Sequence, residues 1–337
     1  MSMNIVYSSS DSYMRCTSVS ICSLLESNIN VEDLNIFILS DDISDNNKND
    51  IVDLGKRFGR KIEIRNAMDI LQSFAVLANL PAFRGSYAVY ASLCIANLFP
   101  NLDRVMVLDA DTLVVDSLDN LWRLDLNGRP LAAVPDVGMY SEISSSEDVD
   151  IIYGSDLYFN TGVLVYDLAI WREQNIDEII QNTIKEYEKS FRVVDQSILN
   201  LALKGNIYTL DLKYNYYTAV HGISFERMRK SFPMRKVFCE HEFSKAKIAP
   251  IIIHFVGLDF ERPWFRRGVT IYKDDYISFL NKTSWVNEDL DELNWDKKII
   301  FILYDEISIL LRKCQFNNVY HWYRYVLGQK IKSFLGV

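Results

Sequence analysis

The sequence predicts an α/β protein in which a sheet is flanked by helices and followed by a C-terminal helical appendage. Short apolar runs rich in β-branched residues alternate with helical patterns along the chain, an order that favours a layered α/β fold. The 337 residues, of which 49% are hydrophobic, are enough for one large domain with an appendage or for two domains. From Trp285 onward the character changes and helical patterns take over.

Strands and helices alternate through the N-terminal part of the chain. We expect strands at residues 4–7, 35–39 and 61–65 and helices at residues 14–25 and 50–58. This order is typical of parallel βαβ units, whose ligands bind beyond the carboxyl ends of the strands. Residues 8–11 follow the first strand, so we expect them to line a ligand site.

The clearest helical pattern covers residues 86–98. Its aromatic and apolar side chains recur with the three- and four-residue spacing of one helix face. Ser86 suits the N-cap position, and Pro100 follows the end of the pattern. We expect this helix to lead into the next strand, which begins at Arg104.

The strand from Arg104 stops at two carboxylates, Asp109 and Asp111, which are separated only by Ala110. Alternate residues of a strand face the same side, so the two carboxylates converge if the strand persists. If it does not persist, a turn can still bring them together. Two hard oxygen ligands suit Mg²⁺ or Mn²⁺ carrying a phosphate-bearing substrate. Ordinary turn chemistry at a strand end is the alternative explanation of the pair.

Further apolar runs follow in the second half of the chain. We expect strands at residues 131–136, 157–166, 207–217 and 250–257 and a helix at residues 176–190. Asn160-Thr161-Gly162 interrupts one of these runs, which indicates a bulge, a close backbone approach or a turn. Asp195 and Gln196 precede a helical pattern that Asp195 can cap. His254 ends a buried run, either as a ligand or as a satisfied core histidine.

The charge distribution indicates which kinds of partner the protein binds. A net charge of −9 argues against a general nucleic-acid binder. The segment 307–337 carries five Lys or Arg and no Asp or Glu, and its apolar and aromatic residues recur at helical spacing from Phe316 to Phe334. Such a segment suits the surface of an anionic inner membrane leaflet, the alternative being a helix that packs on the domain.

The cysteines and the N-terminal residues indicate the cellular compartment of the protein. Five scattered cysteines without a CxxC pair indicate reduced thiols. The first residues resemble no signal peptide, and no apolar run reaches the length of a membrane span. We therefore expect a cytoplasmic protein, peripheral on the cytoplasmic face of the membrane.

Four motifs stand in an order that is more specific than any of them alone. They are Asp109-Ala-Asp111, Phe159-Asn-Thr-Gly-Val163, Asp195-Gln196 and His254-Phe-Val-Gly257. This ordered set resembles the family-8 retaining glycosyltransferases, which include bacterial lipopolysaccharide galactosyl- and glucosyltransferases and glycogenin. The resemblance extends from about Asn4 to Trp264. It implies a GT-A fold, a Rossmann-like mixed sheet flanked by helices, with a catalytic domain at 1–265 and a C-terminal helical region at 266–337.

The resemblance also implies an activity and its residues. The protein would move glucose or galactose from UDP-glucose or UDP-galactose to a saccharide or lipid-linked glycan acceptor, with Mn²⁺, or alternatively Mg²⁺, as cofactor. The implied metal ligands are Asp109, Asp111 and His254. The implied nucleotide-binding residues are Ser8, Ser9, Ser10, Asp11, Tyr13, Ala110, Gly257 and Arg262. The implied sugar-binding residues are Arg84, Asp136, Asn160, Thr161, Asp195 and Gln196, of which the last two are also catalytic.

Three positions depart from the family pattern. Ser10 stands where some members carry an acidic residue that contacts the base. Val89 stands where the helix motif has an Arg, so we assign Arg84 as the substitute. The Lys expected between the His-x-x-Gly and Pro-Trp elements is absent, and Arg262 is the candidate replacement. A guanidinium can bind phosphate with two nitrogens, but its reach differs from that of Lys.

Retention of the anomeric configuration allows two routes. In one, Asp195 attacks the sugar first, as in retaining glycosidases. In the other, the acceptor hydroxyl attacks from the face that the diphosphate leaves, and the neutral amide of Gln196 orients or stabilises the reacting groups. The family position of Gln196 favours the second route. A non-catalytic nucleotide-sugar-binding protein and a metal-dependent phosphohydrolase are the alternative classes.

Overall fold

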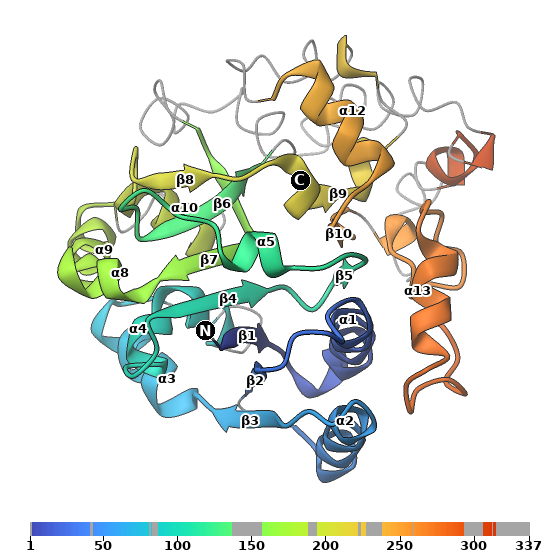
Figure 1. Ribbon diagram of the computed structural model, residues 1–337, viewed down its shortest axis with the longest axis horizontal. Coiled ribbons are helices and arrows are strands. Elements are labelled where there is room, and N and C mark those ends of the chain that lie inside the picture. Colours follow the sequence, from blue (N-terminus) through green and yellow to red (C-terminus); the bar gives the residue numbers. More distant parts are fainter. Residues whose placement is uncertain are drawn as a thin grey trace.

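The computed structural model describes residues 2–40, 43–80, 82, 87–136, 157–187, 194–221, 224–226, 238–257, 259–292, 306–311 and 313–314. Its centre is a seven-stranded mixed sheet with the strand order β3-β2-β1-β4-β7-β6-β8 (Figure 1). The strands are β1 (Met3–Ser8), β2 (Leu34–Ser40), β3 (Ile62–Asn66), β4 (Arg104–Leu108), β6 (Leu131–Pro135), β7 (Phe159–Asp167) and β8 (Ile207–Thr209). The α/β fold class expected from the sequence is confirmed.

Strand direction divides this sheet into two parts. β1 runs parallel to both β2 and β4, and β2 runs parallel to β3. The parallel units expected from the alternating N-terminal pattern are therefore present. β7 is antiparallel to its neighbours β4 and β6, and β8 returns parallel to β6. The carboxyl end of β4 consequently meets the beginning of β7, which brings the Asp pair close to residues 160–162.

Helices cover both faces of the sheet because successive strand residues point to opposite faces. Met106 and Leu108 of β4 enter one hydrophobic cluster, and Val105 and Val107 enter the other. The first cluster also contains residues of α1 (Met14–Ser27), α2 (Asp45–Arg57), α5 (Asp119–Trp122), α12 (Glu240–Ile248) and α13 (Lys273–Leu280). The second contains residues of α3 (Met68–Leu77), η2 (Ala88–Leu93), α4 (Ile95–Leu98), α8 (Leu168–Glu173), α9 (Ile176–Glu186) and α10 (Val194–Ala202).

A second, three-stranded sheet stands at the carboxyl end of β4. Its order is β5-β10-β9, formed by β5 (Thr112–Val114), β10 (Ile252–His254) and β9 (Tyr216–Tyr217). β10 is antiparallel to β5, and the register pairs His254 with Thr112. This register places His254 beside the residues that follow β4.

The prediction of one helix over residues 86–98 is wrong in detail. Over the described part, from Tyr87, the structure has the 3₁₀ segment η2 followed by the short helix α4. The carbonyl oxygen of Ser92 accepts a hydrogen bond from the Tyr166 hydroxyl at 2.8 Å, and the Cys94 N–H donates to the Ala91 carbonyl in the tighter 3₁₀ pattern. The three- and four-residue spacing of the pattern fits an α-helix, whereas the segment that contacts β7 has the tighter 3₁₀ form.

One other expectation needs correction, and another is decided between its alternatives. Residues 207–217 form β8, the 3₁₀ segment η3 (Leu212–Tyr214) and β9 rather than one strand. Asp211 explains the break, because its side chain caps η3 by accepting from the Lys213 N–H at 3.0 Å. Residues 160–162 lie within β7, but the register with β6 shifts there, since Ala133 pairs with Leu164 and Pro135 with Phe159. The structure therefore has a bulge at this motif and, at Gly162, a close backbone approach.

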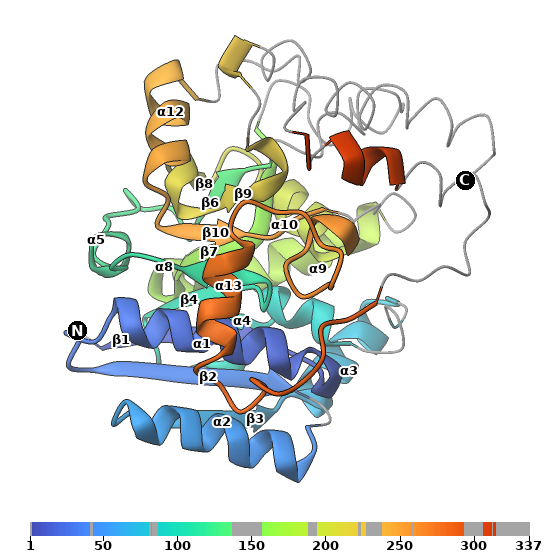
Figure 2. The ribbon, with the colours of Figure 1, turned by 90° about the vertical axis from the view of Figure 1, so that its right-hand side faces the viewer.

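The C-terminal region packs on the first core. α13 lies across α1 (Figure 2), and Tyr276 of α13 joins the cluster that α1 fills. Residues 306–311 are helical, and the buried Ile309 contacts the cluster around Phe260. Arg267 binds Glu306 through two nitrogens, at 2.7 and 2.8 Å. Among the helices that the structure describes, none has the length and hydropathy to cross a bilayer. The basic aromatic segment 316–334 lies outside the described residues.

Candidate active site

The Asp pair sits on a turn that joins the two sheets. β4 ends at Leu108, and the Asp109 N–H donates to the Gly162 carbonyl at 2.8 Å. The backbone then reverses, because the N–H and the hydroxyl of Thr112 both donate to the Asp109 carbonyl, at 3.2 and 2.7 Å. Of the two alternatives left by the sequence, the turn rather than a continued strand brings Asp109 and Asp111 together.

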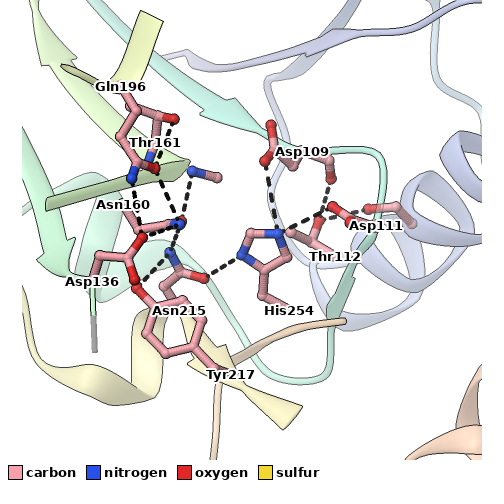
Figure 3. A network of polar contacts seen from close by, with 12 residues as sticks. Asp109, Asp111, Thr112, Asp136, Asn160, Thr161, Gln196, Asn215, Tyr217 and His254 are labelled. Atoms are coloured by element: carbon pink, nitrogen blue, oxygen red, sulfur yellow. Dashed lines mark hydrogen bonds and ion pairs between the residues drawn. The ribbon is translucent and has the colours of Figure 1, made fainter. Parts of the chain in front are cut away.

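His254 completes a cluster with these two carboxylates (Figure 3). Its Nε2 lies 3.1 Å from Asp111 Oδ1 and 3.7 Å from Asp109 Oδ2. One ligand atom from each residue lies within 4.8 Å of the other two. The sequence therefore identified three potential ligands that the fold does bring to one point.

Gly162 makes room for this cluster. A Cβ atom at this position would overlap Cε1 of His254 and lie 2.7 Å from Nδ1 of the same ring and 2.9 Å from Asp109 Oδ2. No other residue type fits there unless the ring or the carboxylate moves. The glycine in the Asn160-Thr161-Gly162 motif is thus explained by the approach of β10 to β7.

Charge controls the protonation of the cluster. Burial disfavours the imidazolium form, but the neighbouring Asp111 and then Asp109 raise the pKa of His254. Burial likewise opposes ionisation of Asp111, yet the attraction of His254 holds its pKa below the usual range. Desolvation and then the charge of Asp111 raise the pKa of Asp109. The Asp109 side chain is 51% exposed, so we attribute more of that shift to the like charge than to desolvation.

The donor set suits a divalent cation. Nδ1 of His254 faces the side-chain oxygen of Asn215 at 2.9 Å, which leaves Nε2 turned toward the two carboxylates. An imidazole nitrogen with a free lone pair and two carboxylates repel one another unless a proton or a cation lies between them. Two carboxylate oxygens and one imidazole nitrogen are a donor set that fits Mn²⁺ and Mg²⁺.

A polar network lies on the other side of Gly162. Gln196 Oε1 accepts from the Thr161 N–H at 3.1 Å, and Gln196 Nε2 donates to Asp136 Oδ2 at 3.1 Å. Asn160 Nδ2 donates to the same Asp136 oxygen at 3.1 Å. These side chains are buried, apart from the half-buried Thr161. Four of the six residues assigned to sugar binding therefore form one connected group.

Asp195 lies beside this group in the first turn of α10, not at an N-cap as the alternative reading supposed. The hydroxyl of Ser92 donates to Asp195 Oδ2 at 3.1 Å. Burial raises the pKa of Asp195 to about 6, although the hydrogen bond from Ser92 opposes that shift. The sixth sugar-site candidate, Arg84, lies outside the described residues.

The side chains that follow β1 mainly form hydrogen bonds within the protein. The Ser9 hydroxyl is 2.7 Å from that of Thr17 in α1. Asp11 Oδ1 accepts from the Ser44 N–H at 2.8 Å, at the start of α2. Ser8 donates to the Ala88 carbonyl at 3.2 Å, and the exposed Ser10 is 3.1 Å from the Ser12 hydroxyl.

Arg262 and Tyr13 meet at the same end of the sheet. Nη1 of Arg262 donates to the Tyr13 hydroxyl at 2.9 Å, and its guanidinium lies 5.3 Å from the Trp264 ring centroid. Its buried Nε has no hydrogen-bond partner among the described residues. A buried guanidinium nitrogen of this kind is available to an anion.

Ala110 and Gly257 have little free space around them. Ala110 is buried within the Asp turn. Gly257 has a φ of +146°, and a Cβ there would lie 2.6 Å from the Glu261 carboxylate. A side chain at position 257 would therefore be strained by the backbone conformation and would require the Glu261 carboxylate to move.

Two site residues were not identified from the sequence. Asn215 contacts His254, and Ser92 contacts Asp195. Neither stands in a recognisable motif, since Asn215 lies in an alternating aromatic run and Ser92 in a helical pattern. The pairing of β10 with β9, which brings Asn215 beside His254, is a tertiary feature that the sequence pattern does not show.

Comparison with known proteins identifies the family of this chain. Residues 4–268 match the sequence profile described as "Glycosyl transferase family 8". The chain is 27% identical to general stress protein A of Bacillus subtilis, over 84% of this chain and 94% of that protein. It is 25% identical to lipopolysaccharide 1,2-glucosyltransferase of Escherichia coli, over 85% of this chain and 80% of that protein. Its fold is that of the galactosyltransferase LgtC, a GT-A structure solved with donor and acceptor sugar analogues (TM-score 0.66, 23% identity, 85% of this chain and 98% of that one).

Proposed function

The chain belongs to glycosyl transferase family 8, and we propose that it is a retaining hexosyltransferase that uses a UDP-sugar, UDP-glucose or UDP-galactose, as donor. The acceptor is a saccharide or a lipid-linked glycan, and the reaction depends on Mn²⁺. The name of the lipopolysaccharide glucosyltransferase supports an acceptor of the surface-polysaccharide kind. The family membership itself makes the protein a glycosyltransferase with a GT-A fold.

One observation carries this proposal. Asp109, Asp111 and His254 converge on one side of Gly162, and the network of Asp136, Asn160, Thr161 and Gln196 lies on the other. A divalent-ion site next to a buried group of amides and a carboxylate is what a sugar diphosphate needs. The ion neutralises the diphosphate, and the amides and carboxylate bind the sugar hydroxyls.

Arg262 supports the leaving group in this proposal. A bound cation at Asp109, Asp111 and His254 would supply Lewis-acid charge to the departing diphosphate. Arg262 adds a positive charge nearby, and its buried Nε is a donor without a hydrogen-bond partner among the described residues. Tyr13 holds the guanidinium in place through the hydrogen bond to Nη1.

The two routes of retention assign different roles to Gln196 and Asp195. The Gln196 amide is held by Thr161 and Asp136, so its orientation is fixed and it can position a sugar but cannot act as a base. We propose attack by the acceptor hydroxyl from the face that the diphosphate leaves. A covalent sugar adduct on Asp195, detected by mass spectrometry, would overturn this route.

The experiment that tests the function measures UDP release from a panel of UDP-sugars. Intact protein and the Asp111→Asn variant are compared with Mn²⁺ and with a chelator. We expect one sugar to give Mn²⁺-dependent release, reduced by at least ~100-fold in the variant, because loss of one charged ligand removes most of the transition-state charge stabilisation. UDP binding without release from any sugar, even with oligosaccharide acceptors, would instead indicate the non-catalytic binding protein.

The C-terminal region carries a separate proposal about location. Membrane contact was expected through 307–337, but Ile309 is buried on the domain, so we propose that residues 315–337 of this segment contact an anionic inner leaflet. The enzyme would then work on the cytoplasmic face of the membrane. The support is the basic, aromatic and acid-free sequence of this segment. The boundary between a catalytic domain at 1–265 and a helical region at 266–337 is likewise a proposal, supported by the end of the family match at residue 268.

A further inference from the structure

We infer that Asn215 is a positioning residue that fixes which nitrogen of His254 binds the cation and that links this ligand to the sugar-side network. The inference rests on the proposed cation site at Asp109, Asp111 and His254. Asn215 itself contacts neither carboxylate in the structure. It is fully buried, in the connection between η3 and β9.

The argument begins at a backbone donor. The Gly162 N–H, which can only donate, lies 2.9 Å from Asn160 Oδ1. The opposite end of the same amide, Nδ2, lies 3.1 Å from the Asp136 carboxylate, which accepts when ionised. The orientation of the Asn160 side chain is therefore determined by two partners whose roles are not interchangeable.

The orientation of Asn160 then determines that of Asn215. Because Asn160 presents an oxygen, the atom of Asn215 that lies 2.8 Å from it must be the donor Nδ2. The other end of the Asn215 amide, Oδ1, consequently faces His254 Nδ1 at 2.9 Å as an acceptor. Nδ1 must carry a proton to donate to it, and the lone pair of the neutral ring is then on Nε2.

The result is a one-way chain of hydrogen bonds from β7 to the cation site, drawn in Figure 3. Its last step turns the Nε2 lone pair toward Asp109 and Asp111. Partners of this kind orient metal-binding histidines and raise their basicity. An amide is suited to position 215 because it donates to Asn160 and accepts from His254 at the same time, which neither an aliphatic side chain nor a carboxylate can do.

The test compares two substitutions of similar size. Asn215→Leu can neither accept nor donate, whereas Asn215→Asp can still accept from Nδ1 but no longer donates to Asn160. Tyr217→Phe is the matched control, because it removes the other polar group near Asn215 Nδ2, at 3.5 Å, and leaves the acceptor of His254 intact. Mn²⁺ affinity is measured by electron paramagnetic resonance of free Mn²⁺ at saturating UDP, and thermal denaturation of the metal-free proteins is recorded alongside.

We expect Asn215→Leu to bind Mn²⁺ about 10- to 100-fold more weakly than the intact protein. Asn215→Asp and Tyr217→Phe should stay within about threefold of the intact protein or bind more tightly. Asn215→Asp should nevertheless be the least stable of the three variants, since it buries a charge beside the Asn160 oxygen. Metal affinity and stability would then follow different orders, which a merely structural role does not produce.

Equal Mn²⁺ affinity of Asn215→Leu and the intact protein would overturn the inference. So would an equal loss in Asn215→Leu and Asn215→Asp. If Asn215→Leu does not fold, Asn215→Ser replaces it, because a serine hydroxyl is too short to reach Nδ1 and should show the same loss. Failure of the intact protein to bind Mn²⁺ with UDP is a distinct result, since it would contradict the proposed cation site itself.

Discussion

At the scale of single residues, Asp195 shows how function and stability can oppose each other. Its carboxyl lies largely out of water beside the sugar-side network, and burial raises its pKa to about 6 although Ser92, Thr161 and two backbone N–H groups donate hydrogen bonds to it. A carboxyl with a raised pKa binds a proton more tightly in the folded than in the unfolded chain. The stability it contributes is present below about pH 4 and is lost as the pH rises to about 6.

We therefore expect Asp195→Asn to stabilise the metal-free protein at pH 7.5. The shift from an unfolded value near 4 corresponds to at most ~3 kcal/mol, and partial exposure reduces this to roughly 1–2 kcal/mol. The measurement is urea denaturation between pH 4 and 8 for both proteins, and the difference should grow between pH 4 and 6. Asp53→Asn, an exposed carboxylate of α2, is the control and should leave the pH dependence unchanged. A constant difference at all pH values would contradict the assignment.

The sequence predicted which residues form the site better than it predicted how they contact one another. Asp109, Asp111 and His254 stand at the ends of apolar runs, where polar side chains are rare enough to be noticed. Asn215 and Ser92 were not accessible, because their roles depend on which strands become neighbours. Nothing local to a Tyr-Asn-Tyr-Tyr run indicates that its amide will face a histidine 39 positions later.

At the scale of elements, periodicity predicted which segments form a helix or a strand, but it predicted the type of helix less reliably. Residues 4–7 and 35–39 alternate or are uniformly apolar and became β1 and β2. Residues 86–98 have the spacing of an α-helix, yet the part described from Tyr87 forms a 3₁₀ segment and a short α-helix. In this segment the Ser92 carbonyl accepts a hydrogen bond from the Tyr166 hydroxyl of β7. Tertiary contacts of this kind are invisible in a local pattern.

The hydrogen bond between Tyr166 and the Ser92 carbonyl leads to a prediction about stability. Tyr166→Phe removes the buried donor to the Ser92 carbonyl and should lower the free energy of unfolding by about 1–2 kcal/mol. Tyr276→Phe is a matched control, because the Tyr276 hydroxyl donates only to the Cys16 sulfur at 3.6 Å, a weak acceptor, and should cost less. Denaturant titration of both variants gives the comparison. Equal costs would mean that the Ser92 carbonyl finds another donor when the hydroxyl is absent.

At the scale of the whole molecule, the C-terminal region is attached to the catalytic part near the proposed phosphate site. Ile309 is buried against the cluster of Phe260, two residues before Arg262. The bidentate pair of Arg267 and Glu306 joins the same two segments. A deletion that begins at residue 307 would expose Phe260 and disturb Arg262, so it could not separate membrane contact from catalysis.

A deletion of residues 315–337 can separate membrane contact from catalysis. We expect it to abolish binding to vesicles that contain anionic phospholipid, because it removes a basic aromatic segment, and to leave UDP release in solution within about twofold. Sedimentation with anionic and with neutral vesicles measures the binding, and UDP release measures the activity. Unchanged sedimentation of the shortened chain with anionic vesicles would exclude a role of this segment at the membrane.

The overall architecture was predictable because it follows from alternation along the chain. The order of strands and helices up to residue 66 determines a parallel sheet whose carboxyl edge binds ligands. The antiparallel insertion of β7 was not determined in this way. The apolar run at 157–166 fits either direction, and the direction depends on the connection from β6, whose residues lie partly outside the described ones.

The contact between Gly162 and His254 has a consequence for the evolution of this site. Every point mutation that changes a glycine adds a Cβ, and at this position the Cβ meets a ring that the cation site requires. A side chain at position 162 is therefore excluded as long as the His254 ring keeps its place. After loss of the histidine, the remaining obstacle is the Asp109 carboxylate, 2.9 Å from such a Cβ, which would have to move. Descendants that change their metal should consequently change His254 first and Gly162 afterwards, an order that reconstructed ancestral sequences can reveal.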